Sequence, residues 1–298
     1  MSTTPQGLQP PRPQTARFLF RGTAVAAAGF LTSLKGKPIT LDPNAPTVHG
    51  EANLPTIGGV SRSVVENPTL AFPEFIEYGR CETSGVGIVK GDATVTTVSA
   101  SVKTVRVTTS PSPEDRVPDI RLISLQADRL SLTIRSVHPK EGDAYFEVVG
   151  TPTTDALSLV ISRRKKPVEV VQIRLEYYDR VIANGTVADL DGEFRKNREF
   201  FDHNAARFKG RVDLKFGESD FPRTRQGYIH CSIVKRIFRG ERLINGNVLE
   251  EPGFGAVFFG EMVANDYNRR ISLVRAQMGS DPKGEMVFAG ADPNGIWS

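Results

Sequence analysis

The stretch TVTTVSASVKTVRV, residues 94–107, decides the fold class. Apolar side chains at Val98, Ala100 and Val102 alternate with serine, threonine and lysine, which is the pattern of a β-strand with one buried face. The alternation resumes at Val105 after a shift of one residue, and such a shift is typical of a β-bulge. We therefore expect a long, bulged strand here, within a mainly β protein.

Similar strand signals recur through the rest of the chain. Short runs rich in valine, isoleucine, leucine and threonine are separated by turn residues, as in antiparallel β-proteins. The further strands that we expect are a pair of runs within residues 120–134 and single runs at residues 144–149, 157–161, 168–178, 228–238, 255–263, 270–278 and 285–289. Residues 35–73 are instead rich in proline, glycine, asparagine and threonine, which predicts long loops around short strands.

One segment departs from the strand pattern. In residues 191–208, the side chains of Phe194, Phe201 and Phe208 fall on a single helical stripe, and the charged side chains lie off it. Gly210 follows directly and is a typical residue for ending a helix. We therefore expect one amphipathic α-helix, inserted in the second half of the chain.

Three short sequence matches occur in the same order in the two halves. The best is RLSL at residues 129–132, which resembles RISL at residues 270–273. The other two matches pair residues 22–26 with 185–188 and residues 101–105 with 233–237. Because unrelated strands reuse the same residue types, convergence in composition is the alternative to duplication. We favour duplication, which predicts two tandem antiparallel units of β-sandwich or barrel-like form.

This interpretation divides the chain into four parts. We expect a flexible proline-rich arm at residues 1–16, a first β domain at 17–150, a connecting β-hairpin with a basic tip at 151–167, and a second β domain with the inserted helix at 168–298.

Composition limits the class of protein. A hydrophobic content of 39% and a charged content of 24% are ordinary for a globular protein and argue against disorder. The net charge of +4 is far below that of a dedicated nucleic-acid binder. The apolar run at residues 23–34 is too short to span a membrane, and the start lacks a signal-peptide pattern. We expect a soluble protein that is cytoplasmic as synthesised, with export by a non-classical route or assembly on a surface left open.

No motif predicts a metal site, a cofactor site or a catalytic set. Cys81 and Cys231 are far apart in sequence, so they form either one disulfide or two separate thiols. The histidines that lack any metal-ligand spacing are His49, His138, His203 and His230. We therefore expect no cofactor and no metal, and we favour a protein that is not an enzyme.

The one local candidate for a binding site is a basic run at the tip of the expected hairpin. It consists of Arg163, Arg164, Lys165 and Lys166. These side chains could contact phosphate groups, but nucleic-acid binding usually adds stacking aromatic residues, and none is interleaved here. The alternative is a solvated turn whose charges keep neighbouring strand edges apart.

These observations favour a structural protein that forms a homo-oligomer, shell, tube or filament from the duplicated β-unit. Long strands have backbone edges that must be covered, and a neighbouring copy is one way to cover them. A β-sandwich module that binds carbohydrate or another protein is the first alternative. A glycan-acting hydrolase is the second, since its paired carboxylates could be brought together from distant loops. The candidate carboxylates are Glu74, Glu77, Asp115, Asp119, Glu250 and Glu251.

Overall fold

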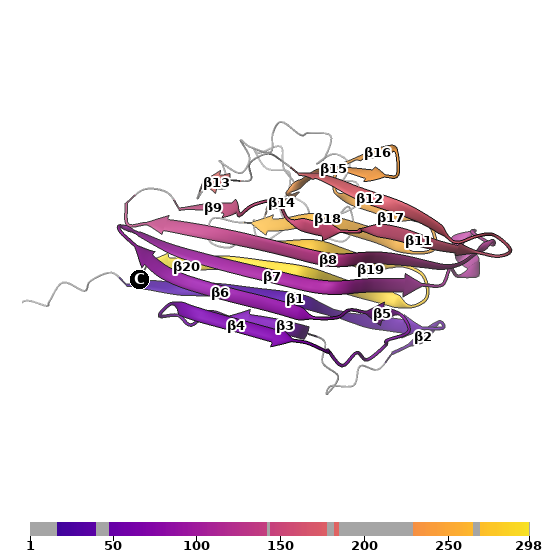
Figure 1. Cartoon of the computed structure of the whole chain (residues 1–298), viewed down its shortest axis with the longest axis horizontal. Helices are drawn as coiled ribbons and strands as arrows, with labels where there is room; N and C mark the ends of the chain where they lie inside the picture. The colour runs from indigo at the N-terminus through magenta and orange to yellow at the C-terminus, as the bar shows by residue number, and fades with distance from the viewer. Residues whose placement is uncertain are drawn as a thin grey trace, which may run out of the picture.

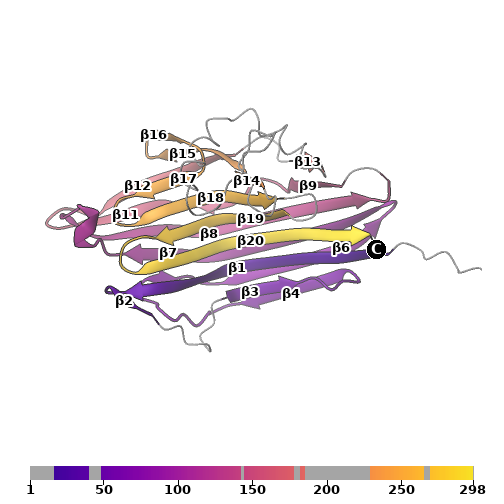
Figure 2. The same ribbon diagram turned by 180° about the vertical axis from the view of Figure 1, so that it is seen from behind.

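The computed structural model describes residues 17–39, 48–141, 144–177, 182–184, 229–264 and 269–297. In these ranges the protein is mainly β, as predicted, and its strands form two sheets that lie face to face (Figures 1 and 2). The predicted arm at residues 1–16 and the predicted helix at residues 191–208 fall outside the described residues. The one helical segment of the described ranges is the 3-10 turn η1 (Pro113–Asp115).

The smaller sheet has eight strands. In order across the sheet they are β14 (Ile229–Ser232), β18 (Gly255–Ala264), β19 (Arg269–Met278), β20 (Lys283–Trp297), β1 (Phe18–Leu34) and β2 (Lys37–Pro38). Two further strands join it: β17 (Val248–Glu251) pairs with β18, and β3 (Val48–Asn53) pairs with β1.

The larger sheet has twelve strands. Its main order is β16 (Arg242–Asn245), β15 (Val234–Arg239), β12 (Glu169–Tyr177), β11 (Ser158–Arg163), β8 (Ile120–Pro139), β7 (Ala93–Thr109), β6 (Cys81–Lys90) and β4 (Gly59–Val65). Four short strands pair off this path: β5 (Ile76–Glu77), β9 (Tyr145–Val148), β10 (Thr153–Asp155) and β13 (Ile182–Asn184).

The buried face of β7 changes where the alternation predicted a shift, because Val102 and Val105 are both buried. The register with β8 is kept across this point: Lys103 lies opposite Arg129 and Val105 opposite Ala127, and both Thr104 and Asp128 are left out of the ladder. Thr104 has a φ of 54°, a left-handed conformation. The expected β-bulge is therefore wrong, because a bulge places an extra residue on one strand only, whereas here one residue is skipped on each strand.

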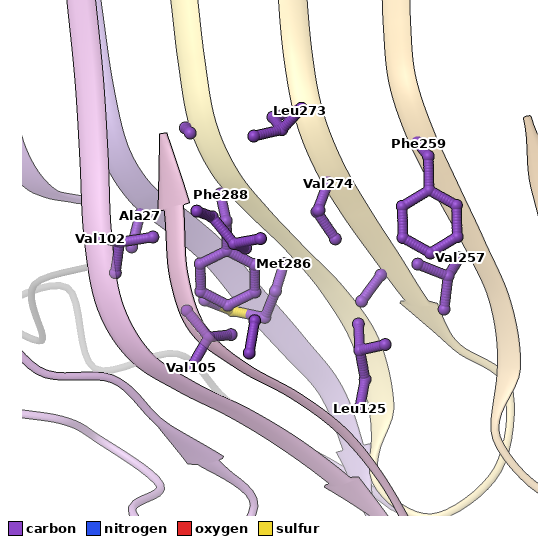
Figure 3. Packing of buried hydrophobic residues seen from close by; sticks show 14 of the residues in the cluster. Ala27, Val102, Val105, Leu125, Val257, Phe259, Leu273, Val274, Met286 and Phe288 are labelled. Carbon is purple, nitrogen blue, oxygen red and sulfur yellow. The ribbon is translucent and has the colours of Figure 1, made fainter. Parts of the chain in front are cut away.

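The core lies between the two sheets and is almost entirely apolar. Its largest fully buried side chains are Phe146, Phe254, Phe259, Phe288, Leu31, Ile123, Leu125, Leu130, Leu132 and Ile134. Figure 3 shows Val102 and Val105 of the larger sheet beside Met286 and Phe288 of β20. Burying each such side chain contributes roughly 1.5–3 kcal/mol, so this layer is the main source of stability.

The strand pairing differs from the expectation of two separate β-units. Strand β1, near the start of the chain, pairs along its length with β20, at its end, so the smaller sheet contains strands from both halves. The larger sheet also crosses the predicted boundary, because β12 joins β11 to β15. The two predicted ranges thus share one sandwich. Period-2 alternation identifies a strand but carries no information about a distant partner.

The sequence matches do not correspond to a repeat of strand order. Residues 129–132 lie in β8, beside the strand β7 that holds residues 101–105. Residues 270–273 lie in β19, in the smaller sheet, whereas residues 233–237 fall mostly in β15 of the larger sheet.

Among the described residues, no helix is long and apolar enough to cross a membrane.

A short arch carries the chain from one sheet to the other. After β3, the backbone amide of Leu54 donates to Gly22 of β1, and the turn at Gly58 then delivers the chain to β4. The ring of Phe20 fills the space under this arch beside Leu54. That space exists because Gly87 of β6 has no side chain: a Cβ there would lie 2.5 Å from the Phe20 ring and 2.8 Å from Leu54.

We expect the variant Gly87→Ala to lower the free energy of unfolding by about 1–3 kcal/mol, because the Phe20 ring must leave its position. The matched control is Gly85→Ala on the same face of β6, where the nearest atom to the added Cβ is 3.6 Å away. We expect that control to change stability by less than about 0.5 kcal/mol. Urea unfolding of both variants measures the difference. Equal effects would contradict the close packing of Phe20 on Gly87.

Candidate functional site

Strand β4 is an open edge of the larger sheet. It pairs in antiparallel register with β6, from Gly59 opposite Gly87 to Val65 opposite Cys81. Its other side has no strand partner in the part of the chain that the structure describes, and it lies along one long border of the sandwich (Figure 1). A strand in this position presents a row of backbone donors and acceptors that a further strand can use.

The outward side chains of this edge are unusually apolar. Val60 is 71% exposed and Val64 is 39% exposed, and both lie on the outer face of the sheet. Three more exposed aliphatic side chains adjoin the Gly59 end of the strand: Ile57 at 89%, Ile88 at 48% and Val89 at 67%. We call these five residues and β4 the edge surface. Grouped exposed aliphatic residues, unlike single ones, mark interaction sites.

Charged side chains accompany the valines of the edge surface. Arg62 stands between Val60 and Val64 and forms an ion pair with Glu82 of β6. Arg80 bridges Glu82, at 3.3 Å, and Glu66, at 3.2 Å, just beyond the end of β4. The hydrogen bond from Arg62 is the main reason why the pKa of Glu82 is lowered. The result is a row of alternating charges along the exposed edge.

The remaining edge of the larger sheet is less suited to pairing. It is formed by β16, which has four residues against seven in β4. Leu243 is its one large exposed aliphatic residue. A short edge strand offers few backbone groups to a partner, which is one of the ways in which proteins protect their edges. The edge surface at β4 is therefore the better candidate for an interaction.

The basic residues predicted as a binding site lie at the tip of the hairpin of β11 and β12, and the hairpin itself is confirmed. Arg164, Lys165 and Lys166 are exposed. Arg163 points elsewhere, because its guanidinium binds the carboxylate of Glu169 at 3.2 Å. The structure therefore divides the predicted cluster into three solvated side chains and one ion-paired side chain.

A second ion pair near this hairpin ties the two sheets together. Arg239 of β15, in the larger sheet, binds Glu251 of β17, in the smaller sheet, at 2.9 Å. Burial raises the pKa of Glu251, and Arg239 opposes that shift. Because each charge is held by the other, this carboxylate acts as a structural contact and not as a free acid.

Other carboxylates that were candidates for catalysis also have structural partners. Glu77 forms an ion pair with Arg106 across β5 and β7. Asp115 accepts hydrogen bonds from the backbone amide of Ser112 and the hydroxyl of Ser280. Within the described ranges, no three His, Cys, Asp or Glu side chains are grouped so as to hold a metal ion. These contacts do not assemble a pair of carboxylates for hydrolysis.

His49, Tyr78 and Cys81 form a buried cluster. Nδ1 of His49 lies 2.5 Å from the hydroxyl of Tyr78, and burial lowers the pKa of His49. Cys81, close to Tyr78, is a free buried thiol whose pKa is raised to about 12 by burial, so it is not a nucleophile at neutral pH. The cluster packs against Ala26 and Gly50 within the sandwich and is best explained as part of the core.

Ser136 and His138 form a serine–histidine contact that sequence reasoning did not find. The Ser136 hydroxyl lies 2.7 Å from Nε2 of His138, and the ring of Phe18 lies 5.0 Å from the imidazole. A serine bound to histidine is chemistry used in nucleophilic catalysis. Here Ser136 is fully buried on the inner face of β8, where no substrate can reach its oxygen.

Asp292, on strand β20, is a carboxylic acid whose pKa is clearly raised. Its carboxylate accepts a hydrogen bond from Asn294, and Arg270 and Arg21 lie near enough to act on it. Burial nevertheless outweighs these arginines and raises the pKa of Asp292 to about 6. The protonated form is thus favoured in the folded protein at mildly acidic pH.

The edge surface was missed in the sequence because Ile57 and strand β4 lie in the loop-rich region 35–73, whereas Ile88 and Val89 come from the end of β6. The run GVSRSVV does alternate, with Val60, Arg62 and Val64 on one face. An arginine in the middle of the apolar row weakens that signal. Alternation also cannot distinguish an edge strand from a central one, since both bury the same face.

Comparison with known proteins places most of the chain in one family. A family model described as a domain of unknown function (DUF8256) matches residues 18–265, from the start of β1 to the end of β18. No curated protein matches the chain, and no solved structure matches it.

Asp292 predicts a measurable pH dependence of stability. Because its folded pKa is raised above the ordinary value of 3.8, the folded state holds this proton more tightly, and the residue favours folding increasingly as pH falls through about 6. In Asp292→Asn, we expect the free energy of unfolding to lack this increase at low pH. The missing increase should be about 1.4 kcal/mol for each unit by which the pKa is raised. Urea unfolding at pH 7.5 and 4.5, with the exposed Asp155→Asn as control, measures it. A pH-independent difference from wild type would contradict the shift.

Proposed function

The chain belongs to the family described as a domain of unknown function (DUF8256), and we propose that it is a non-enzymatic structural protein that associates with further copies of itself. The association runs through the edge surface, with strand β4 of one copy pairing with β4 of another. The single observation that carries this proposal is an edge strand of seven residues that, among the described residues, pairs only with β6 and has Val60 and Val64 exposed on its outer face.

A strand that pairs with β4 would remove two unfavourable features of the edge surface, its unsatisfied backbone groups and its exposed apolar side chains. A second strand along β4 satisfies its outward backbone groups and covers the valines at the same time. Removing apolar surface from water is worth roughly 25 cal/mol per Å², so the exposed valines favour any partner that covers them. A copy of the same strand is the partner that every solution of the protein already contains.

The chemistry of the edge surface supports a protein partner over a glycan. Its exposed apolar side chains are all aliphatic, namely Ile57, Val60, Val64, Ile88 and Val89, and Arg62 lies among them. Ligand sites combine apolar or aromatic surface with a few convergent polar groups in a concave pocket. A strand edge has neither that shape nor aromatic side chains, whereas its backbone suits β-augmentation. The three solvated basic residues at the hairpin tip keep the role of a charged turn.

The test is the oligomeric state of the full chain as a function of concentration, by light scattering and sedimentation velocity. We expect wild type to form a dimer or larger species at micromolar concentration. We expect Val64→Lys to weaken association by about tenfold or more, because a charge on the edge blocks strand pairing.

The matched control is Val170→Lys on β12, a valine that is also well exposed, at 57%, but lies opposite Val160 of β11 and away from the β4 edge of the sheet. We expect it to leave association unchanged, and circular dichroism checks that both variants keep the wild-type strand content. A wild-type chain that stays monomeric across this concentration range would overturn the proposal. Equal loss of association in both variants would move the contact away from β4.

A further inference from the structure

We propose that two copies pair through β4 in one antiparallel register, centred on Val64, in which Arg62 of each copy faces the partner's Glu66. This inference rests on the proposed function and adds the geometry of the contact. It follows from the order of charges along the edge, Arg62 in the strand and Glu66 directly after it.

Symmetry limits the arrangements that need to be compared. A closed dimer of identical chains has a two-fold axis, so the same patch is used on both sides. When a strand pairs with its own copy about such an axis, the strands run antiparallel and residues equally far from the central residue stand opposite each other. The register is therefore defined by the central residue alone. The central residues that leave at least three residues of β4 facing β4 of the partner are Val60, Ser61, Arg62, Ser63 and Val64.

Charge separates these five registers. With Val60 at the centre, Arg62 stands opposite the partner's Gly58. With Arg62 at the centre, it stands opposite the partner's Arg62, and like charges directly opposite each other destabilise a strand pair. With Ser61 or Ser63 at the centre, Arg62 stands opposite a valine of the partner. With Val64 at the centre, residues 63–65 of the two β4 strands face each other and two valines meet on the axis. Arg62 then stands opposite the partner's Glu66 on both sides of the axis, and Val60 stands opposite the partner's Pro68. That register alone pairs unlike charges.

The charges of the single chain are placed to join such a contact. The side chains of Arg62 and Glu66 are each 61% exposed, so each can take a second partner. Within one chain, Arg62 already binds Glu82, and Glu66 already binds Arg80. The register centred on Val64 extends these two pairs into a continuous alternation of charge across the interface. Because opposite charges at a strand pair also select partners, the same row disfavours slipped registers.

The first experiment reverses one charge at a time. In Arg62→Glu, the carboxylate at position 62 faces the partner's Glu66, and in Glu66→Arg, two arginines face each other. We expect each variant alone to dimerise about tenfold or more weakly than wild type, by sedimentation velocity. Mixed in equal amounts, the two variants have opposite charges at both contacts, and we expect a heterodimer close to wild-type affinity.

This mixing experiment controls for effects inside each chain. Each variant also loses one ion pair of its own, with Glu82 or with Arg80, and mixing cannot restore those. Recovery on mixing therefore reports the contact between chains. If the mixture stays as weakly associated as the separate variants, the proposed register is overturned.

The second experiment uses cysteines to find the centre of the register. We would place one cysteine at a time by Ser61→Cys, Arg62→Cys, Ser63→Cys and Val64→Cys, with wild type as the background for oxidation. Only a residue on the two-fold axis faces its own copy, with Cα atoms about 4.5–5.5 Å apart, which suits a disulfide. We expect Val64→Cys to give the most covalent dimer. Strongest cross-linking at any other position overturns the register.

The two proposals fail in different ways. If wild type is monomeric and no cysteine variant cross-links above background, both the proposed function and the register fall. If wild type dimerises and Val64→Lys disrupts the dimer, but mixing does not restore dimerisation of the charge-reversed variants, the proposed function stands and the register falls.

The salt dependence of dimerisation is a further test of the register. We expect a higher ionic strength to weaken the wild-type dimer, because exposed ion pairs are screened.

Discussion

The pairing of β1 with β20 is the contact on which the rest of the structure depends. It joins the start of the chain to its end and continues from Phe18 opposite Trp297 to Ser33 opposite Lys283. Without it, β1, β2 and β3 would separate from β18, β19 and β20, and the smaller sheet could not cover the larger one. Because this contact closes the longest loop available to the chain, its entropic cost is met only when the whole core forms.

The edge surface is a consequence of that pairing. Strand β3 is held by β1, and the arch that follows it, packed over Phe20, carries the chain across to β4 on the other sheet. The position of β4 is thus set by a contact between the two ends of the chain. Its composition balances two requirements: Val60 and Val64 favour a partner strand, and Arg62 between them opposes indiscriminate pairing. In the proposed register, Arg62 would meet both requirements, because it forms an ion pair with Glu66 of a second copy and repels strands that lack such a carboxylate.

Local features of the fold were accessible from the sequence, and distant ones were not. The change of buried face at Thr104 followed from a shift in alternation, and the hairpin of β11 and β12 followed from two strands around a basic turn. Both depend on neighbouring residues alone. The expectation of two separate units came from similar tetrapeptides at residues 129–132 and 270–273, which lie in central strands of different sheets. Strands with the same buried face need the same residue types, whether or not they share an origin.

The candidate site shows the same division. The basic run at the hairpin tip was visible in the sequence, but only the folded chain shows Arg163 turned toward Glu169 and away from the other three residues. The edge surface was hidden, because the five aliphatic residues that form it come from the β3–β4 connection, from β4 and from the end of β6. The sequence by itself determined that the chain is mainly β, where many of its strands lie and where the buried face of one of them changes, because side-chain alternation is a local property of the backbone. The tertiary structure decided which strands meet, which strand is left at an edge and which side chains gather there, because strand pairing joins residues that no local pattern connects.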